Sequence, residues 1–213
     1  GQYSRFTMYG GKIANNMVGG DAGGTTNNNV YGGGVLACNK GSFSMVGGEI
    51  TGNTAKYGGG VAVGLANGLH GNTNEDIGGT FNMTGGKIHG NTCTYNGGGG
   101  VYASASNALN FYVSEAPQIT DNVYKKDISG TTNVANNVYL STYTKNGVPT
   151  PAQINVNQLT DAASIGVTTE DVGQTVASGI SEADAKRFFS DAADRRLQLD
   201  GTQLTMIASK HEA

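Results

Sequence analysis

The chain has 213 residues, of which 37% are hydrophobic and 14% charged, and its formal net charge is −3. No basic cluster exceeds two residues, which excludes a surface that tracks nucleic-acid phosphates, and no apolar run approaches a membrane span. The 35 glycines are more than twice the number expected from average usage of about 7%. The chain starts within a repeat, so we expect it to be part of a longer multidomain protein.

An eight-residue phrase occurs three times, as FTMYGGKI at 6–13, FSMVGGEI at 43–50 and FNMTGGKI at 81–88. Its apolar residues alternate with period two, as on half-buried strands. We interpret the Gly-Gly pair as a corner between strands, since a phosphate-binding loop would need a helix after it. Aligned copies give columns of residues predicted to point inward: Phe6, Phe43 and Phe81; Met8, Met45 and Met83; Ile13, Ile50, Ile88 and Ile119; and, after glycine runs, Val35, Val61 and Val101.

Three short strands per repeat, with identical residues in register, predict an all-β parallel β-helix of about five coils. Each strand would pair with its equivalent about 4.8 Å away along the axis. We expect right-handed winding, because parallel crossovers are nearly always right-handed. The predicted units are β-helix repeats over 1–167 and a C-terminal cap over 168–213, in one continuous structure.

An asparagine follows each isoleucine of the third column by three residues. Stacked asparagines can hydrogen-bond along the axis of a stacked β-structure, so we favour a structural ladder. The alternative is a polar row that binds a sugar. The residues concerned are Asn16, Asn53, Asn91 and Asn122.

The two cysteines are predicted to be free thiols, with Cys93 near the core and Cys38 at a different corner. We expect no metal site and no cofactor. The three histidines share no ligand spacing with the cysteines: His70, His89 and His211.

Three long connections interrupt the pattern, at 15–31, 64–79 and 121–133. The first and third follow an isoleucine strand, so we expect them at one corner, next to each other, and the second at another. Insertions on a solenoid tend to gather on the face that binds a ligand. The predicted ligand contacts are therefore Asp21, Asn27, Asn28, Tyr31, Tyr124 and Lys125.

Polysaccharide-degrading enzymes need paired acids, or a base beside a cation, on one face. The outward Lys12, Glu49 and Lys87 instead predict an alternating charge ladder along the stack. We favour a solvated loop for the one remaining charged cluster and assign no catalytic residue. That cluster is the enzymatic alternative: Asp121, Lys125, Lys126 and Asp127.

After Leu140 the pattern changes, and KNGVPTP at 145–151 indicates a boundary. Segments 154–156 and 164–167 still predict strands, and 181–196 predicts a helix with Ser181 as its N-cap. An Asp-Gly turn at 200–201 predicts a hairpin. We expect the helix, through Phe188 and Phe189, to cover the strand edges of the last coil.

The phrases above resemble the β-helix repeats of large surface proteins of Gram-positive gut bacteria, over 6–103 and more weakly over 104–140. They are more distantly similar to chlamydial polymorphic outer-membrane proteins, whose Phe-x-x-Asn motif this chain lacks. The closer resemblance implies a pectin-lyase-like solenoid on secreted, cell-surface proteins, usually a stalk or adhesin without catalytic residues.

The expected function is thus a non-catalytic, extracellular surface module. It would be a monomeric solenoid whose loops bind host or dietary glycans or another surface protein. Two alternatives remain: a polysaccharide lyase or glycoside hydrolase of the same fold, and a stalk without any ligand.

Overall fold

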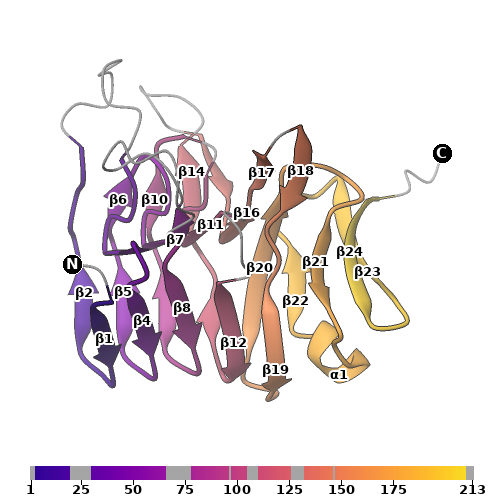
Figure 1. Cartoon of the computed structure of the whole chain (residues 1–213), viewed down its shortest axis with the longest axis horizontal. Helices are drawn as coiled ribbons and strands as arrows, with labels where there is room; N and C mark the ends of the chain where they lie inside the picture. The colour runs from indigo at the N-terminus through magenta and orange to yellow at the C-terminus, as the bar shows by residue number, and fades with distance from the viewer. Residues whose placement is uncertain are drawn as a thin grey trace.

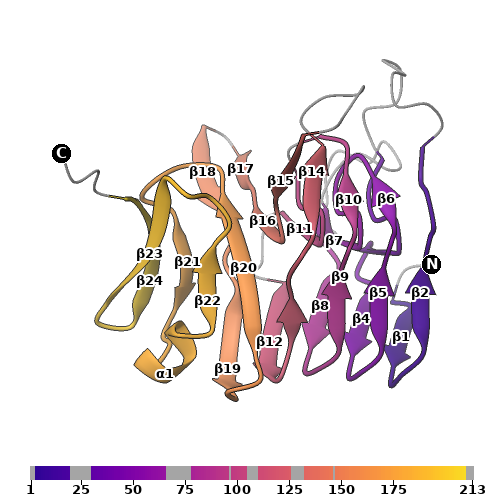
Figure 2. The same ribbon diagram turned by 180° about the vertical axis from the view of Figure 1, so that it is seen from behind.

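The computed structural model describes residues 3–19, 30–65, 78–95, 97–104, 110–125, 132–145 and 147–209. These residues form 24 strands and one short helix, so the fold is all-β, as predicted. The strands lie side by side along the longest axis, with the first repeat at one end and a C-terminal hairpin at the other (Figures 1 and 2).

The Phe-x-Met strands pair in parallel in one five-stranded sheet, with each phenylalanine directly opposite the next. The rings stack, with centroid separations of 5.5, 5.1 and 5.1 Å. The predicted register of this column is therefore confirmed. The strands, in order, are β1 (Arg5–Met8), β4 (Ser42–Met45), β8 (Thr80–Met83), β12 (Phe111–Glu115) and β19 (Asn155–Leu159).

The isoleucine and valine columns form two parallel rows of a second sheet. Both rows end on the same long strand, where Ile119 pairs with Ile165 and Val138 pairs with Val167. The isoleucine row is β2 (Lys12–Ala14), β5 (Glu49–Thr51), β9 (Lys87–His89) and β13 (Gln118–Ile119); the valine row is β3 (Val35–Cys38), β7 (Val61–Leu65), β11 (Val101–Ala103) and β16 (Val138–Leu140); the shared strand is β20 (Ser164–Thr169). This stacking of like on like is consistent with a parallel solenoid.

The prediction of three strands per repeat is incomplete, because a short fourth strand follows the asparagine. These strands have only two or three residues, too few to show a period in the sequence. They form a separate sheet that also contains one antiparallel member: β6 (Thr54–Ala55), β10 (Thr92–Cys93), β14 (Val123–Lys125) and β15 (Asn133–Ala135).

The predicted columns line the core. Phe81 is fully buried, whereas Phe6 is 51% exposed because it belongs to the outermost strand of its sheet. Ile13 and Val35, also in the first repeat, are only partly buried. The Gly-Gly pairs lie at corners, as predicted, and Gly48 and Gly86 have φ of +91° and +85°, a region that favours glycine.

The helix predicted over 181–196 is wrong beyond its first turn. Helix α1 spans only Glu182–Ala185, with Ser181 as the N-cap that accepts from the Asp184 N–H. The chain then forms β22 (Phe188–Ser190), which pairs in parallel with β20. Phe188 therefore points inward, 7% exposed, and covers Ile165, while Phe189 points outward and is 40% exposed. Pairing with β20 overrides the local helical pattern.

The remaining strands form hairpins and a small antiparallel sheet. Lys145 and residues 148–151 of the KNGVPTP segment, which indicated a boundary, belong to the hairpin of β17 (Thr142–Lys145) and β18 (Val148–Pro151). In the C-terminal hairpin, Asp200 pairs with Gln203, so the turn is Gly201-Thr202, one residue later than predicted. This hairpin consists of β23 (Arg195–Asp200) and β24 (Gln203–Ala208), and β24 also pairs with β21 (Thr175–Ser178). The boundary at 167/168 stays a prediction.

Candidate functional site

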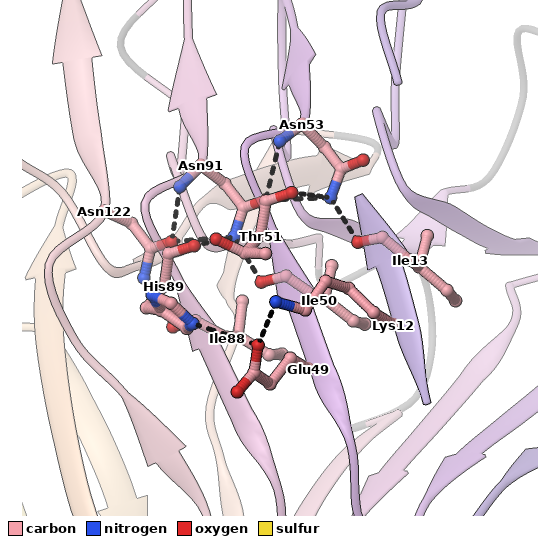
Figure 3. Close-up of polar contacts among 10 residues, drawn as sticks. All are labelled: Lys12, Ile13, Glu49, Ile50, Thr51, Asn53, Ile88, His89, Asn91 and Asn122. Carbon is pink, nitrogen blue, oxygen red and sulfur yellow. Dashed lines mark hydrogen bonds and ion pairs between the residues drawn. The ribbon is translucent and has the colours of Figure 1, made fainter. Parts of the chain in front are cut away.

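The asparagine column forms a continuous hydrogen-bonded ladder (Figure 3). The Asn53 Nδ2 donates to Asn91 Oδ1 at 3.0 Å, and Asn91 Nδ2 donates to Asn122 Oδ1 at 2.9 Å. Asn16 Nδ2 donates to Asn53 in the same way, at 2.9 Å. Asn53, Asn91 and Asn122 are fully buried. They cannot contact a sugar, so the structural ladder is confirmed and the alternative of a sugar-binding row is wrong for them.

The ladder continues beyond the predicted column. Asn122 Nδ2 donates to Asn137 Oδ1 at 3.0 Å, and Asn137 Nδ2 donates to Asp191 Oδ1 at 2.6 Å. The Asp191 carboxylate also accepts from the Asn137 N–H and the Thr168 hydroxyl. An ionised carboxylate only accepts hydrogen bonds, so Asp191 ends the row. Burial raises the pKa of Asp191, although these hydrogen bonds act in the opposite direction.

The predicted charge ladder lies on the outer side of the isoleucine strands. Lys12 Nζ lies 2.7 Å from Glu49 Oε2, and Lys87 is opposite Glu49 in register. The Lys12 ammonium, through its hydrogen bond and its charge, lowers the pKa of Glu49. His89 Nε2 is 3.9 Å from the same carboxylate oxygen (Figure 3). These side chains are exposed, and such pairs contribute little to stability.

The predicted ligand-binding loops are only partly described. Asp21, Asn27 and Asn28 lie outside the described residues. The flanks of the first and third loops belong to the same sheet, because Met17 bridges Thr54 of β6 and the third loop joins β14 to β15. The flanks lie at opposite edges of this sheet, with β6 and β10 between them, so the prediction that the two loops are neighbours is wrong for their described anchors. The second loop follows β7, in a different sheet.

The cluster behind the enzymatic alternative is also incomplete, since Lys126 and Asp127 lie outside the described residues. Asp121 has a φ of 59° at a corner, and its carboxylate accepts from the Thr120 hydroxyl at 2.9 Å. Lys125 ends β14 and is exposed. Within the described ranges, no ion pair joins Asp121 to Lys125, and no group of three His, Cys, Asp or Glu side chains is placed to hold a metal ion.

Both cysteines are free thiols, as predicted. Cys93 is buried in the slot that Ala55 occupies one repeat earlier, and the two residues pair in register. Burial raises the pKa of the Cys93 thiol to about 12.

A cluster of five tyrosines, which we call the tyrosine row, lies on the outer side of the valine strands and at the corner before them. Three of them occupy the corner before the glycine runs, and two face outward from the valine strands. Ring centroids lie 5.0 Å apart for Tyr31–Tyr57, 5.4 Å for Tyr57–Tyr95 and 5.3 Å for Tyr57–Tyr102. The row comprises Tyr31, Tyr57, Tyr95, Tyr102 and Tyr139, the last stacked on Tyr102 at 6.1 Å.

The tyrosine row covers the outer face of the valine strands. Ala62 faces outward between the inward Val61 and Val63, yet it is fully buried, and it pairs with Tyr102 on the next strand. The small side chain at this position leaves room for the rings above it. Tyr95, at 55% exposed, is the most accessible member.

Sequence reasoning identified only Tyr31 of these five. The recurrence of tyrosine shortly before a glycine run, in Tyr31-Gly, Tyr57-Gly and Tyr95-Asn-Gly, is the signal that would have found the corner residues. The predicted contacts Tyr124 and Lys125 belong to β14, where Tyr124 pairs with Cys93 rather than with a ring of the row.

Comparisons with models of protein families, with curated proteins and with solved structures find no match. Within the described ranges, no helix is long and apolar enough to cross a membrane.

Proposed function

We propose that the chain is a non-catalytic module of a bacterial cell-surface protein, in which a right-handed parallel β-helix serves as a rigid stalk and presents a surface that binds glycans. The resemblance of its repeats to those of surface proteins of gut bacteria supports the class and the location. The parallel sheets support the architecture.

The observation that carries the proposal is the contrast between an invariant interior and variable connections. The phenylalanine stack and the asparagine ladder run without a break through successive repeats. A buried side-chain network of this kind, fully hydrogen-bonded, fixes one arrangement of the backbone. The long connections at 15–31 and 121–133 join this scaffold at a single sheet. Rigid scaffolds with variable loops are the usual supports of binding sites.

Loop replacement tests this proposal. Segments 20–29 and 126–131 are each replaced by a short Gly-Ser linker, and binding to immobilised mucin and to a glycan array is measured. Replacement of 66–77, which follows β7 in another sheet, is the matched control. We expect the first two replacements to abolish binding, the control to retain it, and all three to unfold at similar temperatures. Binding that survives both replacements would contradict the assignment of the loops.

The enzymatic alternative is tested in parallel. Pectin, alginate and glycosaminoglycans are incubated with the protein and screened for new reducing ends and unsaturated products. Product formation that disappears in Asp121→Ala would replace the proposed binding function with catalysis.

A further inference from the structure

We propose that Tyr57, Tyr95 and Lys56 form a subsite for an acidic oligosaccharide, with sugar rings against the tyrosines and a sugar carboxylate at the lysine. This inference rests on the proposed function: it adds to the long connections a second glycan-contacting surface, joined to the first connection through Tyr31, and names the chemical class of the ligand.

The aromatic part of the subsite lies at an exposed corner. Tyr57 is the centre of the row, in contact with Tyr31, Tyr95 and Tyr102. Its ring is tilted by 59° from that of Tyr95, so the two rings do not cover each other face to face. A pyranose has an apolar C–H face and a rim of hydroxyls. Tyrosine matches it, because it combines an apolar ring with a polar tip.

The phenol groups of the row act as neutral hydrogen-bonding partners. Burial, together with the neighbouring phenols, raises the pKa of Tyr57 to about 12, and burial also raises the pKa of Tyr31 and of Tyr102. At neutral pH these hydroxyls therefore stay protonated and can both donate to and accept from sugar hydroxyls.

Lys56 supplies the positive charge. Its Nζ lies 5.7 Å from the ring centroid of Tyr57 and 5.3 Å from that of Tyr95. No carboxylate of the described residues pairs with this ammonium. At the other end of the row, burial raises the pKa of Tyr139, and the Glu170 and Asp171 carboxylates raise it further while Arg195 opposes them. A carboxylate on the ligand is thus attracted to the Lys56 end of the row.

The shape of the row favours a linear chain over a folded protein. Its corner members come one from each successive repeat, at a spacing of about 4.8 Å along the axis. Tyr95 is 55% exposed, Tyr31, Tyr57 and Tyr102 are partly buried and Tyr139 is 8% exposed, so five side chains of about 200 Å² each expose well under about 500 Å² together. A protein partner of standard size buries about 800 Å² on each side. A narrow strip that runs along the stack suits an oligosaccharide laid along the same direction.

The test uses calorimetric titration of the whole chain with galacturonate oligosaccharides and with neutral galactose oligosaccharides of equal length. Tyr95→Ala should weaken binding of both by about tenfold, since a stacked ring is lost, while Tyr95→Phe should retain it. Lys56→Met keeps the aliphatic stem of the side chain. It should lower the affinity for the acidic ligand alone, by about threefold to fivefold, and remove the salt dependence of that affinity. The matched control is Tyr112→Ala, an exposed tyrosine of β12 outside the row.

Three outcomes would overturn the inference. In the first, Tyr95→Ala and Lys56→Met bind galacturonate as the wild type does. In the second, the wild type binds no galacturonate but still binds mucin in a loop-dependent manner; the proposed function then survives and only the subsite fails. In the third, a proline-rich peptide binds and depends on the same side chains, which assigns the row to an extended peptide. Absence of binding to mucin and to every glycan would remove the proposed function as well.

Discussion

The asparagine ladder allows a sharp test through Asn91→Ala. The buried Asn91 side chain accepts from the Asn53 N–H and Nδ2 and donates to Ile50 O, His89 O and Asn122 Oδ1. Alanine leaves the Asn53 backbone N–H without an acceptor, at a cost of about 1–3 kcal/mol, and removes further bonds worth about 0.5–1.5 kcal/mol each. We expect a loss of about 4 kcal/mol in the free energy of unfolding, a large part of a typical total of 5–15 kcal/mol.

The measurement is urea and thermal unfolding followed by circular dichroism. A loss of 4 kcal/mol corresponds to a midpoint lowered by about 8–16 °C in a domain of this size. Asn16→Ala is the matched control at the exposed end of the ladder, where Asn53 Oδ1 keeps its bond from the Asn16 N–H. It should cost less than about 1 kcal/mol. Equal losses in the two variants would refute the reasoning, because they would show that burial within the ladder does not determine the cost.

Three further results are expected. Gly59→Ala should destabilise strongly, since its Cβ would lie 2.6 Å from Gly99 O, whereas Gly10→Ala, with open space around it, should not; thermal midpoints compare them. Because the pKa of Asp191 is raised in the folded protein, the contribution of this side chain to the free energy of unfolding falls with rising pH. The fall begins at the ordinary carboxyl pKa of about 4 and ends above the pKa of the folded state. The stability difference between wild type and Asp191→Asn in urea should therefore shrink over this range; a constant or growing difference contradicts it. In native protein at pH 8, iodoacetamide should label the half-buried Cys38 well before the fully buried Cys93, as mass spectrometry can show; equal labelling would refute their difference in burial.

The core of the fold could be predicted because it follows from short-range periodicity. The residues of the Phe-x-Met and isoleucine strands alternate within three or four positions, and identical residues in successive copies fix the register. The features that the sequence did not predict depend on contacts between distant segments. The sequence of residues 188–190 alone predicts a helix. These residues form a strand because they pair with the edge of β20. Asp191 joins the ladder 54 positions away from Asn137, with no local pattern to mark it.

The candidate site was predictable only in part. The loops stand out as interruptions of the repeat, but their sequences do not say where their ends meet. The tyrosine row combines two kinds of position: Tyr57 and Tyr95 stand before glycine runs at different distances, and Tyr102 is in a strand. Only the stacking of successive repeats brings these positions together. An alignment of the repeats that compares one position at a time therefore does not reveal the row.

The asparagine ladder also has an electrical direction. Every side-chain amide in it donates toward the C-terminal end, so the amide dipoles add head to tail, with their positive ends toward the last repeat. The carboxylate of Asp191 lies at that positive end. An anion at the N-terminus of a helix is stabilised in the same manner. The row of side chains thus acts as a small macrodipole inside an all-β fold, and its field partly offsets the burial of the charge that ends it.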